Sequence, residues 1–167
     1  PMSGEWWGAS DDAESIRTIH RALELGVTLF DTAEGYGKGH AEVVLGQALR
    51  GRRDQAVIAD KVGPGHLEPV LIRQAFEDSC ARLQTDHLDV YFIHWPNIDV
   101  PIGPAMEELE AMRQEGKIRA IGVSNFTVAE MDEARQSGRI DVLQPPYNMF
   151  WRYVERDEIP YLSLIHI

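Results

Sequence analysis

Residues 27–31, Val-Thr-Leu-Phe-Asp, form a short apolar run that ends on a carboxylate. The pattern returns four more times, because each later apolar run along the chain also ends on a polar side chain. A stretch with the apolar spacing of a helix separates each run from the next, which indicates parallel strands joined by helices. The residues that end the five runs are Asp31, Lys61, His94, the pair Ser124-Asn125, and Gln144.

The spacing of these strand ends indicates one architecture. Successive ends are 30, 33, 30 and 20 residues apart, and about 30 residues is the length of one βαβ unit. Repeated units of this kind predict an α/β fold of the (β/α)8 TIM-barrel type, which carries its chemistry at the carboxyl ends of the strands. Such a barrel needs about 250 residues. The 167 residues of this chain therefore predict an incomplete barrel, with about strands 2 to 6 and their helices.

Two local signals mark the ends of helices. Asp11 with Glu14, and Thr127 with Glu130, have the spacing of helix capping boxes. Gly26 follows the first apolar helical pattern at the position where glycine commonly ends a helix. These signals predict helices that begin just after residues 11 and 127.

The composition limits the partners of the chain. The formal net charge is −11, from 27 acidic and 16 basic residues, which disfavours a nucleic acid or an anionic membrane as partner. The single cysteine, Cys80, fits a reducing and therefore cytoplasmic location. Because Cys80 lies in an apolar helical pattern, we expect it to be buried in packing. No apolar run approaches the roughly 18–20 residues of a membrane span.

Four side chains near the first three strand ends have the chemistry for reducing a carbonyl group. This reaction needs a hydride and a proton for the carbonyl oxygen. Tyr36 is a weak acid by itself, but the ammonium of Lys61 would stabilise its phenolate and make it a better proton donor. Asp31 can hold Lys61 by a charge-assisted hydrogen bond. His94 can hydrogen-bond the substrate oxygen, and Tyr36 then delivers the proton.

The segment around Asp31 resembles the signature of the aldo-keto reductase superfamily. It reads Gly-Val-Thr-Leu-Phe-Asp-Thr-Ala-Glu-Gly-Tyr-Gly over residues 26–37. Further blocks of the family follow in the right order, and the resemblance covers residues 1 to 161. These blocks are Glu42, Leu45-Gly46, Lys61, His94-Trp95-Pro96, residues 122–126 and Leu143-Gln144.

The resemblance implies a (β/α)8 barrel that binds a nicotinamide cofactor without a Rossmann domain. It implies an NAD(P)H-dependent oxidoreductase that reduces an aldehyde or ketone, a small-molecule substrate, to an alcohol. The cofactor implied is NADPH, with NADH as the alternative. By the same resemblance, the catalytic tetrad is Asp31, Tyr36, Lys61 and His94.

The resemblance also assigns two further groups of residues. One group hydrogen-bonds the nicotinamide carboxamide, and amide side chains suit this task because they carry both donors and acceptors. Its members are Ser124, Asn125 and Gln144. The other group consists of loop aromatics that shape the substrate pocket, namely Trp6, Trp7 and Trp95.

The chain divides into a partial barrel domain over residues 1–161 and a short tail over residues 162–167. The tail reads Leu-Ser-Leu-Ile-His-Ile, and we expect it to be read-through from a sequencing library and not native protein. The codons of the source DNA would test this. We also expect residues 1–167 alone to lack activity, because strands are missing at both ends of the barrel.

Other interpretations of the same residues stay open. Asp31 could merely cap a helix, and His94 could be a hydrogen-bonded core histidine. The barrel could serve a non-catalytic regulatory subunit. Asp31, Glu34 and His94 could bind a metal in a hydrolase or isomerase, although the charge of Lys61 disfavours a cation there. Four further histidines have no evident partners and are interpreted as surface residues: His20, His40, His66 and His87.

Overall fold

A five-stranded parallel sheet forms the centre of the molecule. The computed structural model describes residue 2 and residues 8–165. Each strand pairs with the next one along the chain, so that the spatial order is β1-β2-β3-β4-β5. The strands are β1 (Leu29–Asp31), β2 (Val57–Val62), β3 (Leu88–Ile93), β4 (Ile118–Ser124) and β5 (Val142–Gln144). The five predicted strands are therefore confirmed, with ends shifted by one or two residues.

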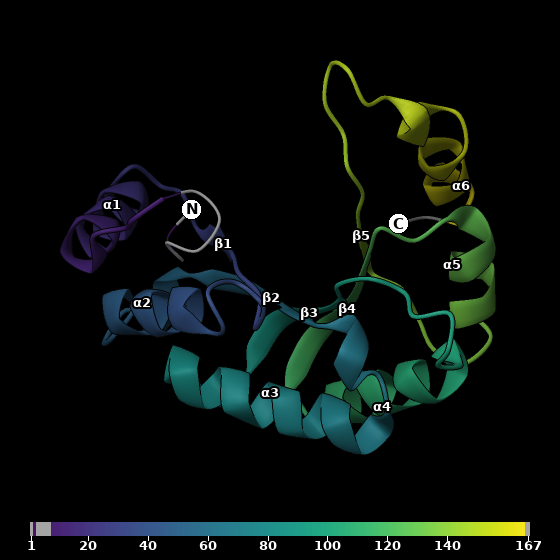
Figure 1. Cartoon of the computed structure of the whole chain (residues 1–167), viewed down its shortest axis with the longest axis horizontal. Helices are drawn as coiled ribbons and strands as arrows, with labels where there is room; N and C mark the ends of the chain where they lie inside the picture. Colours follow the sequence, from purple (N-terminus) through teal and green to yellow (C-terminus); the bar gives the residue numbers. More distant parts are fainter. Residues whose placement is uncertain (1, 3–7, 166–167) are drawn as a thin grey trace.

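The sheet curls, and helices cover its convex side. Figure 1 shows α2, α3 and α4 along this side, with α1 at one end and α5 and α6 at the other. The arrangement is a curled half-barrel, which confirms the prediction of an incomplete (β/α)8 barrel. The helices are α1 (Asp12–Glu24), α2 (His40–Ala48), α3 (Pro69–Leu83), α4 (Ile102–Gln114), α5 (Val128–Ala134) and α6 (Glu158–Ile165).

The predicted capping residues lie at the observed helix ends, and all but one of the predicted capping contacts form. Thr127 and Glu130 form the complete capping box of α5. Asp11 caps α1 by accepting hydrogen bonds from the backbone of the first turn. Glu14 instead pairs with Arg17, so the reciprocal half of this predicted box was wrong. Gly26, with φ +83°, lies just beyond α1 as predicted.

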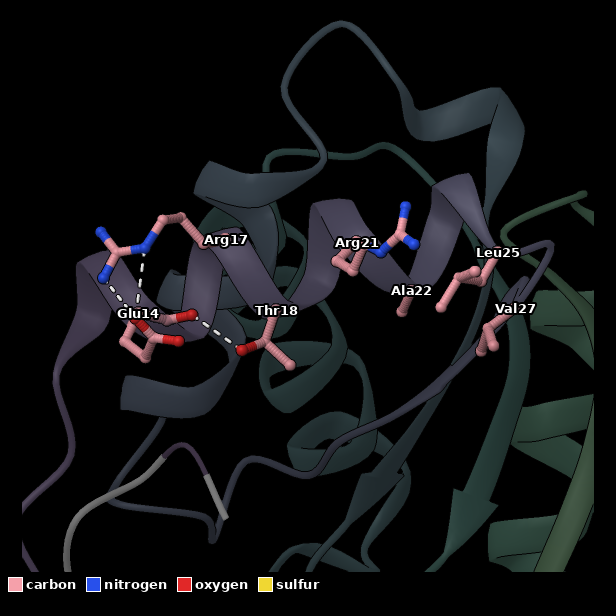
Figure 2. Close-up of a pocket in the computed structure, with 7 residues that line it drawn as sticks. All are labelled: Glu14, Arg17, Thr18, Arg21, Ala22, Leu25 and Val27. Carbon is pink, nitrogen blue, oxygen red and sulfur yellow. Dashed lines mark hydrogen bonds and ion pairs between the residues drawn. The ribbon is translucent and has the colours of Figure 1, made fainter.

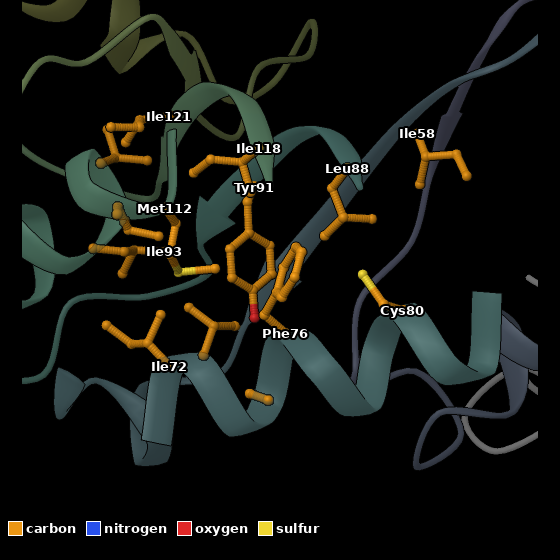
Figure 3. Close-up of a cluster of buried hydrophobic side chains, with 14 of the residues drawn as sticks. Ile58, Ile72, Phe76, Cys80, Leu88, Tyr91, Ile93, Met112, Ile118 and Ile121 are labelled. Carbon is orange, nitrogen blue, oxygen red and sulfur yellow. The ribbon is translucent and has the colours of Figure 1, made fainter. Parts of the chain in front are cut away.

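The core lies between the convex face of the sheet and the helices. In Figure 3, Tyr91 of β3 meets Phe76 of α3, and their rings pack edge to face with centroids 5.8 Å apart. Cys80 is buried in the same cluster, as expected. Burial raises the pKa of the Cys80 thiol to about 12. The thiol is therefore protonated at neutral pH and acts as a packing group.

A glycine allows α2 and α3 to approach closely. A Cβ atom on Gly46 would lie 2.5 Å from the backbone oxygen of Arg82, which leaves no room for a side chain. At this contact the Arg82 guanidinium donates to Glu42, whose side chain is fully buried, with an Nε–Oε2 distance of 2.7 Å. The pair compensates the burial of the Glu42 carboxylate.

The β1 side of the sheet exposes apolar side chains. Leu29 and Val57 are 58% and 38% exposed, and Leu25 and Val27 are exposed beside them. Figure 2 shows Leu25 and Val27 at one end of a shallow groove along α1, while charged residues line its other end. This surface is what an unclosed barrel leaves uncovered. Within the described residues, no helix is both long and apolar enough to span a bilayer.

The four histidines that were expected to lack partners each have one, so this prediction was wrong. His20 Nε2 lies 2.8 Å from the Ala48 carbonyl, and His40 lies 2.9 Å from Asp12. His66 contacts Glu34, and His87 contacts Asp86. Three of these four partners lie far away in the sequence and come close only when the helices and loops pack together.

Candidate active site

Four side chains converge at the carboxyl ends of β1, β2 and β3. Asp31 ends β1, Lys61 lies near the end of β2, and His94 directly follows β3. Tyr36 lies in the loop after β1. Lys61 Nζ is at the centre, since it donates to Asp31 Oδ1 at 2.6 Å and lies 3.4 Å from Tyr36 Oη. The structure therefore brings together Tyr36 and the three residues that the sequence placed at successive strand ends.

Lys61 is deeply buried and well compensated. Its side chain is 1% exposed, whereas that of Asp31 is 37% exposed. Besides the Asp31 carboxylate, the ammonium donates to the backbone carbonyl of Thr32 at 2.8 Å. A buried charge is tolerated when a counter-charge and further hydrogen bonds satisfy it. The contact between Lys61 and the Thr32 carbonyl could not be predicted from the sequence. Every residue carries a backbone carbonyl, so the residue type does not indicate which one accepts a hydrogen bond.

Tyr36 and His94 face each other across the site. Their rings are edge to face at 5.7 Å, with an interplanar angle of 82°. Lys61 Nζ lies 5.0 Å from the centre of the Tyr36 ring. Burial, and then the charge of Lys61, lower the pKa of His94 below its usual value. The imidazole is therefore neutral at pH 7, with one ring nitrogen available as a hydrogen-bond donor.

Ser124, Asn125 and Gln144 form a second group beside the first. Ser124 Oγ donates to the backbone oxygen of Gln144 at 2.9 Å. Asn125 adopts a left-handed backbone conformation with φ +63°. Its Nδ2 atom donates to the backbone oxygen of His94 at 3.0 Å and to Ser124 Oγ at 2.9 Å. The ends of β3, β4 and β5 are thus held together by these hydrogen bonds.

Besides the contact of Asn125 with the His94 backbone, a hydrogen bond between two side chains joins the two groups. Gln144 Nε2 donates to Asp31 Oδ2 at 2.9 Å, from the last strand of the sheet to the first. Sequence reasoning did not predict this contact. Its two partners are 113 residues apart, and only the curl of the sheet brings them together.

The second group has the hydrogen-bonding capacity that a nicotinamide carboxamide needs. The amide nitrogens of Asn125 and Gln144 are both engaged in the contacts above. Among the residues that the structure describes, none donates to the oxygen of either amide. A carboxamide carries two N–H donors, which match two free amide oxygens. The residues present therefore fit the group.

Glu34 connects two loops at the mouth of the site. Its Oε1 accepts a hydrogen bond from the backbone N–H of Gly63 at 2.5 Å and lies 2.9 Å from His66 Nδ1. It thereby links the loop after β1 to the loop after β2. The sequence suggested Glu34 only as a metal ligand. Across the described part of the chain, no three His, Cys, Asp or Glu side chains are grouped closely enough to hold a metal.

Of the three tryptophans proposed for the substrate pocket, the structure describes Trp95. Trp95 follows His94, is 49% exposed, and has its ring centre 6.5 Å from that of His94. It therefore borders the site from the loop after β3. Trp6 and Trp7 lie outside the described residues.

Fold and site together define a protein of the (β/α)8-barrel class with polar residues at its strand ends. The model of the aldo/keto reductase family matches residues 2–164, and the chain belongs to this family. The aldo-keto reductase YhdN of Bacillus subtilis is 42% identical over 170 residues, which cover 96% of this chain and 51% of that protein.

Two further comparisons agree with this family assignment. The NADH-specific methylglyoxal reductase of Escherichia coli is 33% identical, over 93% of this chain and 54% of its own length. The crystal structure of an aldo-keto reductase from Klebsiella pneumoniae in complex with NADPH superposes with a TM-score of 0.87 at 36% identity. That match covers 92% of this chain and 55% of the other. The chain spans about half the length of the curated relatives it matches.

Proposed function

We propose that the protein containing this chain is an NAD(P)H-dependent reductase that converts an aldehyde or ketone to an alcohol. One observation carries the proposal: a tyrosine hydroxyl lies beside a buried lysine that a carboxylate holds, and a neutral histidine ring packs edge to face against the tyrosine ring. Lys61 Nζ is 2.6 Å from Asp31 and 3.4 Å from Tyr36 Oη. This arrangement suits the delivery of a proton to a carbonyl oxygen.

Each residue of the tetrad has a distinct task in this proposal. Tyr36 donates its hydroxyl proton to the carbonyl oxygen. Lys61 stabilises the phenolate that remains, because the ammonium is close and shielded from water. Asp31 holds Lys61 in place. His94, neutral at pH 7, donates a ring N–H hydrogen bond that orients the carbonyl oxygen before transfer.

The cofactor supplies the hydride when it is bound. Ser124, Asn125 and Gln144 would hold its carboxamide. The free amide oxygens of Asn125 and Gln144 match the two carboxamide N–H groups, and the Ser124 hydroxyl holds both residues in place. The Klebsiella pneumoniae relative with bound NADPH supports NADPH as the cofactor. NADH is the alternative, because another relative is named an NADH-specific reductase.

The substrate is a small carbonyl compound, and the protein acts in the cytoplasm. Trp95 lies beside His94 at the edge of the site, where it can contact the substrate next to the reacting group. Cys80 is buried and reduced, in line with a reducing compartment. The division into a barrel domain over residues 1–161 and a non-native tail over 162–167 stays a prediction. Helix α6 crosses this boundary.

The test measures NADPH oxidation by the full-length protein with a panel of aldehydes and ketones. We expect Tyr36→Phe to lower kcat by about 10²–10⁴-fold, because the phenyl ring has no proton to give. NADPH binding should stay close to wild type. Tyr153→Phe is the matched control, since Tyr153 is exposed and lies outside the site. Wild-type inactivity on every substrate, or equal rates for Tyr36→Phe, would refute the proposal.

A further inference from the structure

The two carboxylate oxygens of Asp31 have different partners. Oδ1 accepts from Lys61 Nζ at 2.6 Å, which is the contact that the proton-delivery mechanism uses. Oδ2 accepts from Gln144 Nε2 at 2.9 Å. The mechanism gives no task to this second hydrogen bond. It connects a residue of the proton-donating group to a residue of the cofactor-holding group.

The chemistry of the two partners fixes which way the Gln144 amide points. A side-chain amide can present either its NH₂ group or its oxygen after a half turn, whereas a carboxylate can only accept. Beside Asp31, the amide must therefore place Nε2 toward the carboxylate and Oε1 away from it. The backbone of Gln144 is also held, because its carbonyl accepts from Ser124 Oγ and from the Asn125 N–H.

The Asn125 amide is oriented in a similar way, but by two other residues. Its Nδ2 donates to the backbone oxygen of His94 and to Ser124 Oγ, which leaves Oδ1 as the free acceptor. Both amides therefore keep an oxygen available. Asp31 sets the orientation of only one of them, so Asn125 provides an internal comparison.

We propose that Asp31 has a second role as a positioning residue for the cofactor. By accepting from Gln144 Nε2, it keeps the Gln144 oxygen free to accept a hydrogen bond from the nicotinamide carboxamide. The proposal rests on the proposed function, because it requires that Gln144 contacts the carboxamide. It predicts that the effects of Asp31 and Gln144 on cofactor binding depend on each other.

A double-mutant cycle of NADPH dissociation constants tests this in the full-length protein. The four proteins are wild type, Asp31→Ala, Gln144→Ala and the double variant. NADPH is the probe because its dihydronicotinamide ring is uncharged, so that loss of the Asp31 charge has little direct effect on it. We expect each single change to weaken binding about three- to tenfold, and the double variant to bind no more weakly than Gln144→Ala.

A second cycle provides the control. Asn125→Gly removes the other amide while keeping a residue that tolerates the left-handed backbone at this position. Because the Asn125 amide is oriented by His94 and Ser124, its effect and that of Asp31→Ala should multiply. If Asp31→Ala does not fold because it leaves Lys61 unpaired, both cycles are measured with Lys61→Met in every protein.

The outcomes separate this proposal from the proposed function. If Asp31→Ala weakens NADPH binding by the same factor with and without Gln144, or does not weaken it at all, the positioning role is wrong. The reductase proposal would survive that result. If the wild-type protein binds neither NADPH nor NADH, both proposals are wrong.

Discussion

Asp60 and Lys61 are neighbours on β2, and both side chains are almost fully buried, yet their surroundings are opposite. Lys61 faces the site and has a carboxylate and a backbone carbonyl as hydrogen-bond partners. Asp60 faces the helices, where neither carboxyl oxygen makes a hydrogen bond of good geometry with the described residues, although Ser79 and the Lys61 backbone lie near enough to favour the charged form. Burial, and then the nearby charge of Glu42, raise the pKa of Asp60 well above its usual value.

The difference shows that two buried ionisable groups on one strand can be stabilised in different ways. On the site face, partners offset the cost of burying a charge, and the charge is kept for chemistry. On the helix face, the neighbouring groups do not offset that cost, and burial raises the pKa of the Asp60 carboxyl group, which favours its protonated form. Changing Lys61 should therefore affect catalysis most, whereas changing Asp60 should affect mainly stability.

The largest effect is expected from Lys61→Met. The variant keeps an unbranched side chain of similar length but removes the ammonium that, in the proposed function, stabilises the Tyr36 phenolate. We expect kcat for NADPH-dependent carbonyl reduction to fall by about a hundredfold or more. Steady-state kinetics on the full-length protein measures this, and urea unfolding shows whether the fold is kept. A folded variant with near wild-type kcat would contradict the role of Lys61.

A smaller effect, visible as a change with pH, is expected from Asp60→Asn. Because the pKa of Asp60 is raised in the folded protein, the unfolded chain releases this proton first as pH rises. The contribution of Asp60 to the free energy of unfolding therefore falls from about pH 4 upward, at up to about 1.4 kcal/mol per pH unit, until the folded pKa is reached. Asparagine has no proton to lose, so the variant should gain relative stability over this range.

Urea unfolding of wild type and Asp60→Asn at pH 5 and pH 8 measures the difference. The control is Asp54→Asn, which changes an exposed aspartate and should show no such trend. Carbonyl reduction by Asp60→Asn should stay within about twofold of wild type, because Asp60 faces away from the site. An equal stability difference at both pH values would argue against a protonated Asp60.

The smallest effect on stability is expected from Tyr91→Phe. Tyr91 lies on β3, where it pairs in register with Asp60 of β2. The Tyr91 hydroxyl is buried and has no partner in the described structure. Removing an unsatisfied buried hydroxyl is neutral or stabilising by about 1 kcal/mol. Thermal unfolding of the full-length variant measures this change. A loss of more than about 1 kcal/mol would mean that the hydroxyl has a partner in solution.

The strand ends, and the meeting of four side chains close to them, could be predicted from the sequence because local patterns determine them. An apolar run that ends on a polar side chain marks the point where a buried strand reaches the mouth of a barrel. Asp31, Lys61 and His94 stand at such points, and Tyr36 was predicted to join them from a loop because of its chemistry beside Lys61. The structure brings all four together.

Contacts that depend on the paths of loops, or on which face of a strand packs against the helices, could not be predicted from the sequence. The hydrogen bond from the Gly63 backbone to Glu34 requires the paths of two loops, and no residue spacing encodes it. The burial of Asp60 depends on which face of β2 turns to the helices. Since Asp60 and Lys61 are adjacent and both polar, the sequence pattern does not decide which of them faces the site.

The hydrogen bond between Gln144 and Asp31 measures the curvature of the sheet. Neighbouring strands lie about 4.8 Å apart, so a flat sheet of five strands would separate its outer strands by about 19 Å. A direct side-chain contact between β1 and β5 requires the sheet to bend until the distance between these two outer strands is much shorter. A flatter sheet could keep every strand pairing and still lose the site. Packing on the convex face, far from the substrate, thus sets the geometry of the chemistry.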